Sequence, residues 1–194
     1  MSSSKISNRI MKTNLLFFGF PVILFFSICV SAQAKKIQSV YTNLDIKSCK
    51  TLESSVDEGG WYLGECRGIG GYRLQITEGD IRQSINVIAP NKKKFELDFY
   101  RNVSAAFSSV GAKAEWRVVR SKGKTVTPMA LIVRYYVSEN PDDSSILTSY
   151  LVVSKITKNE ICITNVVKSS ANANTKARKL ADASAIEPCK VSDN

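Results

Sequence analysis

Four cysteines lie in the part of the chain that follows an apolar N-terminal leader. They are Cys49, Cys66, Cys162 and Cys189. An even number of cysteines without a C-x-x-C pair is typical, in an exported chain, of a disulfide framework rather than a metal or redox site. Three pairings are possible. We favour Cys49–Cys66 with Cys162–Cys189, because the partners in each pair are close in sequence and each bond then holds one half of the chain together.

The leader has the pattern of a secretory signal peptide. Basic residues stand before an uncharged apolar run over residues 15–30, and small residues follow at Ala32 and Ala34. This order predicts a signal peptide over residues 1–34 that is cleaved after Ala34. The basic residues are Lys5, Arg9 and Lys12. Met11 is an alternative start, because the segment after it is a complete n-region by itself.

The apolar run of 16 residues is interrupted by Gly19 and Pro21. It is shorter than the roughly 20 residues that a membrane-spanning helix needs. We therefore expect no integral membrane span after cleavage and a periplasmic or secreted mature protein over residues 35–194.

The charge of the mature chain bears on its partners. Cleavage removes three of the 27 basic residues and none of the 17 acidic ones, which leaves 160 residues with a net charge of +7. Such an excess favours association with anionic surfaces. The expected partner is an anionic envelope polymer or another envelope protein. Nucleic acid is not expected for an exported chain, and the oligomeric state stays open.

Period-two alternation of apolar and polar residues runs through most of the mature chain. Residues 72–77 and 81–88 alternate on either side of the Glu78-Gly79-Asp80 turn, which predicts a hairpin with one wet face. Further strands are predicted over residues 95–100, 114–120, 126–138, 149–156 and 161–167. The segments 129–137 and 149–156 are so continuously apolar that we expect central strands covered on both faces. Polar tails are expected at residues 35–39 and 191–194.

One helix is predicted near the C-terminus, over about residues 174–186. It follows Asn172 or Asn174 as the N-cap, is rich in alanine, and ends before Pro188. A Cys162–Cys189 bond would hold the end of this helix against the preceding strand. The predicted fold is mainly β: one domain built as an antiparallel β sandwich or partly open barrel, with the C-terminal α-helix packed on it and two disulfides.

The composition excludes several chemistries. The chain contains no histidine, so histidine-dependent catalytic triads and histidine metal sites are ruled out. We expect no metal and no cofactor. The glycine-rich segment 66–72 lacks the helix that must follow a phosphate-binding loop, and it is interpreted as a tight connection beside a disulfide.

A carboxylate-dependent extracytoplasmic hydrolase is the enzymatic alternative to a noncatalytic protein. Its candidate acids are Asp45, Glu65, Glu78, Asp80, Glu96 and Asp98. Most of these residues are in predicted turns or on the solvent faces of strands, where acidic residues support solubility. No catalytic residue is therefore assigned.

Two features are candidates for binding. The first is the wet face of the predicted hairpin, where Arg73, Gln75, Arg82, Ser84 and Asn86 form a polar patch. The second is Arg134, which interrupts the apolar run of residues 130–136. A charge in such a run is paired with an acid, stacked on an aromatic ring or exposed to a ligand, and we expect an acidic partner.

The segments 41–45 with Cys49, 66–72 and 78–82 resemble small exported proteins of Gram-negative bacteria, in particular alphaproteobacteria, that have no assigned activity. This resemblance covers about half of the mature chain and implies no catalytic residue. In architecture alone, the chain is also similar to periplasmic inhibitors of cell-wall hydrolases. A net charge of +7 opposes the approach to a basic lysozyme, which disfavours that alternative. The expected function is binding of an anionic envelope component or a protein partner, without catalysis.

Overall fold

The computed structural model describes residues 36–57, 60–120 and 126–191, and these residues form ten strands. The strands are β1 (Ile37–Asn43), β2 (Lys50–Ser55), β3 (Trp61–Arg67), β4 (Arg73–Gly79), β5 (Arg82–Ile88), β6 (Lys94–Glu96), β7 (Ser108–Arg120), β8 (Val126–Val137), β9 (Thr148–Ile156) and β10 (Ile161–Lys168). The helices are α1 (Phe99–Asn102) and α2 (Ala173–Ala183), with 3-10 turns η1 (Ile46–Ser48) and η2 (Ser184–Ile186). The predicted signal peptide and its cleavage site lie outside the described residues.

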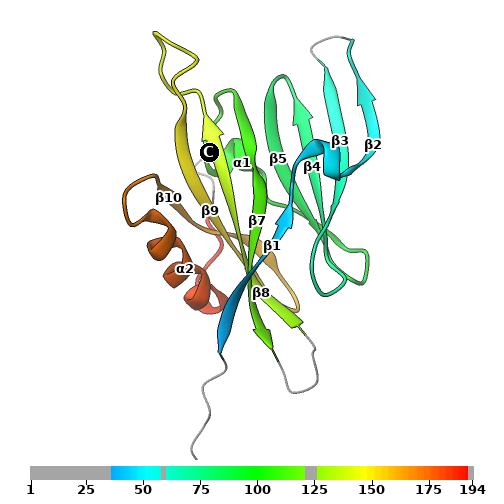
Figure 1. Ribbon diagram of the computed structural model, residues 1–194, viewed down its shortest axis with the longest axis vertical. Coiled ribbons are helices and arrows are strands. Elements are labelled where there is room, and N and C mark those ends of the chain that lie inside the picture. Colours follow the sequence, from blue (N-terminus) through cyan, green and yellow to red (C-terminus); the bar gives the residue numbers. More distant parts are fainter. Residues whose placement is uncertain (1–35, 58–59, 121–125, 192–194) are drawn as a thin grey trace, which may run out of the picture. The chain divides into compact units, whose positions relative to one another are not determined.

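The strands belong to one sheet that does not close, and the sheet has two five-stranded halves. One half has the order β1-β7-β8-β9-β10 and the other the order β2-β3-β4-β5-β6, with antiparallel neighbours throughout. A single parallel bridge, Arg82 with Ser108, connects the halves. Figure 1 shows β2–β5 grouped beside β7–β9. The predicted mainly β fold with a partly open sheet is confirmed.

The main core lies between the inner faces of the two halves. Ile76 and Ile85 of one half and Trp116 and Tyr135 of the other belong to the same buried cluster, and all four are fully buried. These residues alternate with polar ones along their strands, so the period-two pattern sends them to a common inner face. Burial of such side chains contributes about 1.5–3 kcal/mol each and is the main force that holds the halves together.

A second core lies on the outer face of β8–β10, under α2 (Figure 1). Ala177 and Ala181 lie one turn apart on the helix and are fully buried against Ile132 and Val153. The small alanine side chains allow the helix to approach the sheet closely. Strands β8 and β9 are thus covered on both faces, as their apolar sequences predict. Of the two N-cap positions predicted, Asn172 and Asn174, the helix has Asn172, whose side chain makes no capping hydrogen bond.

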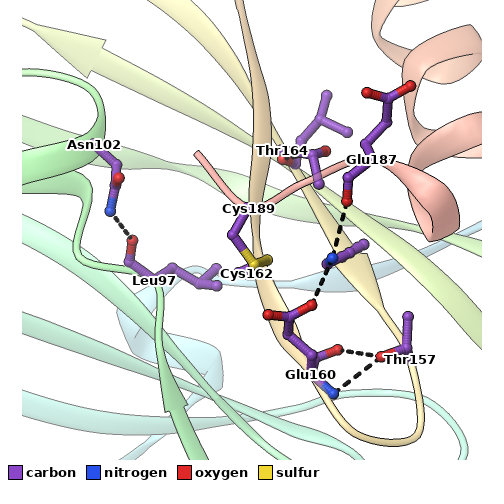
Figure 2. The surroundings of a disulfide bond; sticks show 10 residues. Leu97, Asn102, Thr157, Glu160, Cys162, Thr164, Glu187 and Cys189 are labelled. Atoms are coloured by element: carbon purple, nitrogen blue, oxygen red, sulfur yellow. Dashed lines mark hydrogen bonds and ion pairs between the residues drawn. A yellow bond between two sulfur atoms is a disulfide. The ribbon is translucent and has the colours of Figure 1, made fainter. Parts of the chain in front are cut away.

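Two disulfides fasten the fold with the pairing predicted from sequence, Cys49–Cys66 and Cys162–Cys189. The first connects the end of η1 to β3, and the second connects β10 to the segment after η2. Beside the second bond, the Lys155 ammonium group contacts the Glu160 carboxylate at 2.6 Å and donates to the Glu187 carbonyl oxygen at 2.9 Å. Figure 2 shows Glu160 and Glu187 near this bridge. The helix end is therefore held by a covalent bond and by Lys155.

The predicted hairpin forms, but its turn is one residue further along than predicted. Strand β4 extends to Gly79, and the two turn residues are Asp80 and Ile81, both with positive φ. A two-residue hairpin loop favours this geometry because its twist matches that of the strands. Ile81, which was predicted to begin the next strand, is 61% exposed.

Three other expectations need correction. The predicted strand over residues 95–100 ends at Glu96, because Asp98 has a φ of 46° and turns the chain into α1. Residues 37–39, predicted as part of a polar tail, form the start of β1 and pair with β7. Strand β7 begins at Ser108, six residues before its predicted start at Ala114. The glycine-rich segment is a tight turn, as predicted, in which Gly70 and Gly71 have positive φ.

Candidate anion-binding pocket

The predicted wet face of the hairpin forms a mixed polar surface. The strand register aligns Glu65, Gln75, Asn86 and Glu96 in one row across β3–β6, on the face opposite the core. Arg73 donates from Nη1 to Glu65 Oε1 at 3.1 Å, and Gln75 donates to the other oxygen at 3.5 Å. Glu65 thus neutralises Arg73, while Lys50 and Arg67 line the same part of the surface without an ion-pair partner among the described residues.

Arg82 is occupied by contacts within the protein. Its Nε donates to the Ala105 carbonyl oxygen at 2.7 Å, and its Nη1 contacts both the carbonyl and the carboxylate of Asp80. The guanidinium carbon lies 4.6 Å from the centre of the Phe107 ring. These contacts fix the chain before β7 against the hairpin, so Arg82 holds two loops together.

Ser84 and Asn86 line a cleft of about 490 Å³ between the outer sheet face and α1. The Ser84 hydroxyl oxygen accepts a hydrogen bond from the Phe99 backbone at 3.0 Å, which supports the first turn of α1. Glu96 and Asp98, two of the acids considered for a hydrolase, line the same cleft. The structure thus brings together two of the predicted binding residues, away from Arg134.

Arg134 lies on the outer face of β8 and was expected to have an acidic partner. That expectation is wrong: within the described residues no carboxylate oxygen lies within 4.0 Å of its guanidinium. Its Nη1 instead donates to the Ser149 hydroxyl at 2.8 Å, and its Nη2 donates to the Asn174 amide oxygen at 3.2 Å. Both acceptors are neutral, so the positive charge of Arg134 is not compensated by an ion pair.

A pocket of about 290 Å³ surrounds this arginine at the junction of β1, β7, β8, β9 and α2. Its basic side chains are those of Lys113, Arg134 and Arg178, and its one acidic side chain is that of Glu115. Arg178 donates from Nε and Nη2 to the two oxygens of Glu115, at 2.6 and 3.1 Å. This bidentate pair consumes one positive charge, and Lys113 and Arg134 leave the pocket with a surplus of two.

The pocket wall is held by a network of charged groups between sheet and helix. Arg117 of β7 forms a second bidentate pair with Asp182 of α2, with nitrogen–oxygen distances of 2.6 and 2.8 Å. The Arg117 and Glu115 side chains are only 10% and 11% exposed. Charges that are removed from water in this way need close partners, and the network therefore fixes how α2 lies on the sheet.

The network also sets the protonation states of its members. Burial raises the pKa of the Glu115 carboxyl, but hydrogen bonds from Arg178 and Ser39 together with the Arg178 charge bring this pKa below its ordinary value of 4.5. The hydrogen bond to Glu115 raises the pKa of Arg178, and the hydrogen bond to Asp182 raises that of Arg117. Both arginines are therefore cations, and Glu115 is an anion, at neutral pH.

Sequence reasoning found Arg134 but missed Lys113 and Arg178. Lys113, Glu115 and Arg117 are every second residue of β7, so they lie on the same outer face. This period-two spacing of charged residues was a sequence signal that could have identified Lys113. Arg178 lies one turn after Asn174 on the same side of α2. No sequence pattern places the helix over this part of the sheet, so the convergence appears only in the folded structure.

One group of potential metal ligands occurs among the described residues. An oxygen of Glu160 and the sulfurs of Cys162 and Cys189 lie within 4.8 Å of one another (Figure 2). The two sulfurs are bonded to each other, whereas a metal-binding cysteine must be a thiolate. This group is therefore explained as the surroundings of a disulfide.

No protein-family model, no curated protein and no solved structure matches this chain. The resemblance to exported proteins of Gram-negative bacteria thus stays an expectation. Among the described residues, neither helix has the length and apolar character needed to cross a bilayer. The function is therefore inferred from the geometry of the pocket.

Proposed function

We propose that the protein is an exported, noncatalytic binding domain of the bacterial envelope that recognises an anionic group of an envelope component in the pocket around Arg134. Lys113 and Arg134 supply the attraction, and Arg178, held by Glu115, forms part of the wall. The observation that carries this proposal is the uncompensated charge of Arg134. A partly buried guanidinium with neutral acceptors is a ready partner for a phosphate or carboxylate.

The donors of Arg134 support the proposal. A guanidinium has five N–H donors, and the contacts with Ser149 and Asn174 involve only Nη1 and Nη2. Further donors are therefore available to an incoming anion, and the two neutral contacts hold the planar group in place. Because Lys113 is exposed and has no ion-pair partner among the described residues, it can turn toward the same anion.

The size and floor of the pocket limit the ligand. Ile132 and Leu151 line it and are 3% and 5% exposed. A volume of about 290 Å³ is at the small end of the range for ligand pockets, roughly 300–1,000 Å³. The pocket thus suits one anionic group with a few attached atoms, such as a single phosphate or carboxylate on a larger envelope molecule.

The hydrolase alternative has its best-placed residues elsewhere, in Glu96 and Asp98. Glu96 accepts from Lys94 at 2.7 Å, and the Asp98 carboxylate lies 3.4 Å from Arg101 Nε. A glycoside hydrolase needs two carboxyl groups that flank the scissile bond, whereas these two are engaged in ion pairs with Lys94 and Arg101. These ion pairs favour the binding proposal over the hydrolase.

Export is part of the proposal. The leader pattern and two disulfides support it, because disulfides persist in oxidising compartments. N-terminal sequencing of protein recovered from the periplasm or medium of an expressing bacterium tests it. A mature chain that begins at Lys35 is expected. Recovery of the uncleaved chain in the cytoplasm would reject export.

Retention on immobilised lipopolysaccharide at increasing salt tests the ligand class. The wild-type protein is expected to bind and to elute with salt, because the attraction is between charges that ions screen. Arg134→Gln and Lys113→Gln are expected to lose retention. Arg73→Gln is the matched control: it makes the same chemical change at an arginine that Glu65 already neutralises.

Comparison of the Arg73 and Arg134 variants distinguishes binding in the pocket from a general effect of net charge. Equal loss in the Arg73 and Arg134 variants would mean that net charge alone causes retention, which would overturn the assignment of the pocket. Retention of the wild type that does not change with salt would contradict an anionic ligand. A protein captured from envelope extract only when Arg134 is intact would favour the protein-partner alternative.

A further inference from the structure

The cleft between β5, β6 and α1 contains an unpartnered polar side chain. Asn86 is 7% exposed and lines this cleft of about 490 Å³, and its amide makes no hydrogen bond to any described residue. Asn86 is not among the residues with a fully buried polar atom that lacks a partner, which are Tyr62 and Asn102, so its amide is open to the cleft. The Asn86 amide therefore offers a donor and an acceptor to a ligand in the cleft.

The charges that surround Asn86 cancel. Lys94 pairs with Glu96 and Arg101 pairs with Asp98, and all four side chains line the cleft. Two positive and two negative groups give no net attraction for an anion or a cation. They do give many donors and acceptors, joined by the hydroxyl groups of Thr77 and Ser84. The complementary ligand is uncharged and carries both donors and acceptors.

An aromatic ring stands at the edge of the cleft. Tyr100 of α1 lines it and is 51% exposed. Its place depends on the Asp98 turn, which is held where the Asn102 amide donates to the carbonyl oxygens of Leu97 and Asp98, both at 3.0 Å. Figure 2 shows the first of these bonds. The backbone that carries the exposed ring is thus held beside a polar cleft, and the Arg82 guanidinium carbon lies 6.0 Å from the ring centre.

We propose that this cleft binds a neutral saccharide. A sugar ring has an apolar face that packs against an aromatic ring and hydroxyl groups that act as both donors and acceptors. Tyr100 provides the ring and Asn86 provides the free amide. The paired charged side chains around Asn86 donate and accept hydrogen bonds, and because their charges cancel they do not favour a charged ligand. The site shares no lining residue with the Arg134 pocket and goes beyond the proposed anion binding.

Titration of ¹⁵N-labelled protein with neutral oligosaccharides tests the proposal, with one series built from glucose and one from N-acetylglucosamine. One series is expected to shift the side-chain NH₂ signals of Asn86 together with the backbone signals of α1. Tyr100→Ala is expected to weaken binding at least about tenfold, and Tyr100→Phe to retain it, because the aromatic ring remains. Trp61→Ala is the matched control, since Trp61 is similarly exposed, at 43%, and does not line the cleft.

The exposed position of Tyr100 keeps the test independent of folding, and thermal unfolding of each variant checks this. Arg134→Gln is expected to leave saccharide binding unchanged, so failure of the anion proposal and failure of this one are distinguishable. Absence of Asn86 shifts with both series, unchanged affinity in Tyr100→Ala, or weakening by salt would overturn the proposal. If a titration with peptides shifted the Asn86 signals while neither oligosaccharide series did, the saccharide proposal would also be overturned.

Discussion

Arg178 and Glu115 form a bidentate ion pair that connects α2 to β7 at the rim of the Arg134 pocket, with nitrogen–oxygen distances of 2.6 and 3.1 Å. The tyrosine hydroxyl of Tyr41 in β1 accepts from the same guanidinium at 3.0 Å. Three elements that are far apart in sequence therefore meet at one arginine. The pocket exists only while α2 is docked, so the stability of the helix and the proposed binding are coupled.

Loss of the second ion pair is expected to loosen the helix. Asp182→Asn removes the carboxylate that neutralises Arg117, whose side chain is only 10% exposed. Arg117 then keeps only one carboxylate partner, that of Glu115, which is 3.8 Å away and already paired with Arg178. Because Asp182 is partly exposed, the free energy of unfolding is expected to fall by about 2 kcal/mol, less than the roughly 3–5 kcal/mol for breaking a fully buried pair. Denaturant unfolding measures the loss. Glu96→Gln is the control: both partners of its ion pair are exposed, and such pairs contribute only about 0–1 kcal/mol. Equal effects in the two variants would reject the role of the network.

Acid is expected to weaken the same junction. The pKa of Glu115 is lower in the folded protein than its ordinary value of 4.5, so the folded state favours the ionised carboxylate. The resulting stabilisation is fully present above that ordinary value and is lost as the pH falls through the lower, folded pKa. Unfolding experiments at a series of pH values should show a smaller drop in acid for Glu115→Gln than for the wild type. Parallel pH profiles would contradict this assignment.

Each disulfide is expected to contribute separately to stability. The cysteines are 17 residues apart in the first bond and 27 apart in the second. Loop-closure entropy predicts losses of about 3 kcal/mol for the Cys49→Ser/Cys66→Ser variant and about 3.5 kcal/mol for the Cys162→Ser/Cys189→Ser variant. Denaturant unfolding measures both losses. If free thiols were detected in unfolded, unreduced protein from the periplasm, the paired framework would be wrong.

The hairpin turn offers a stabilising substitution. Ile81 has a φ of 57° and is 61% exposed, so its side chain gains little from burial while its backbone is in the left-handed region. Glycine adopts that region without steric strain. Ile81→Gly is therefore expected to raise the free energy of unfolding by about 1 kcal/mol, measured as a higher denaturant midpoint. Destabilisation would show that Ile81 makes a contact that offsets this strain.

Alternation predicted the strands from β4 onward, because burial on one face repeats every second residue, but β1, β2 and β3 were not predicted. Leu74, Ile76, Ile85 and Val87 follow it and are fully buried. It failed at Phe99, which continues the buried pattern of Phe95 and Leu97 but does so from a helix. The positive φ of Asp98 redirects the backbone, and burial periodicity carries no information about that turn.

The sequence indicated single binding residues but not which of them lie together in the folded protein. An arginine inside an apolar run marked Arg134, yet the sequence suggested an acidic partner where the structure has Ser149 and Asn174. Lys113 and Arg178 join it through tertiary packing. Asn86 was assigned to a polar patch, but the cleft that it lines is formed in part by α1, a helix that the sequence did not predict.

Titration with inorganic phosphate shows directly whether Arg134 binds an anion. In ¹⁵N-labelled protein, the Nε–H signal of Arg134 is identified by its absence in Arg134→Gln and followed during a phosphate titration at constant ionic strength. We predict a saturable shift of this signal, lost in Lys113→Gln, while the corresponding signal of Arg73 stays unchanged. A signal of Arg134 that does not move, or that moves no more than that of Arg73, would contradict an anion site in this pocket.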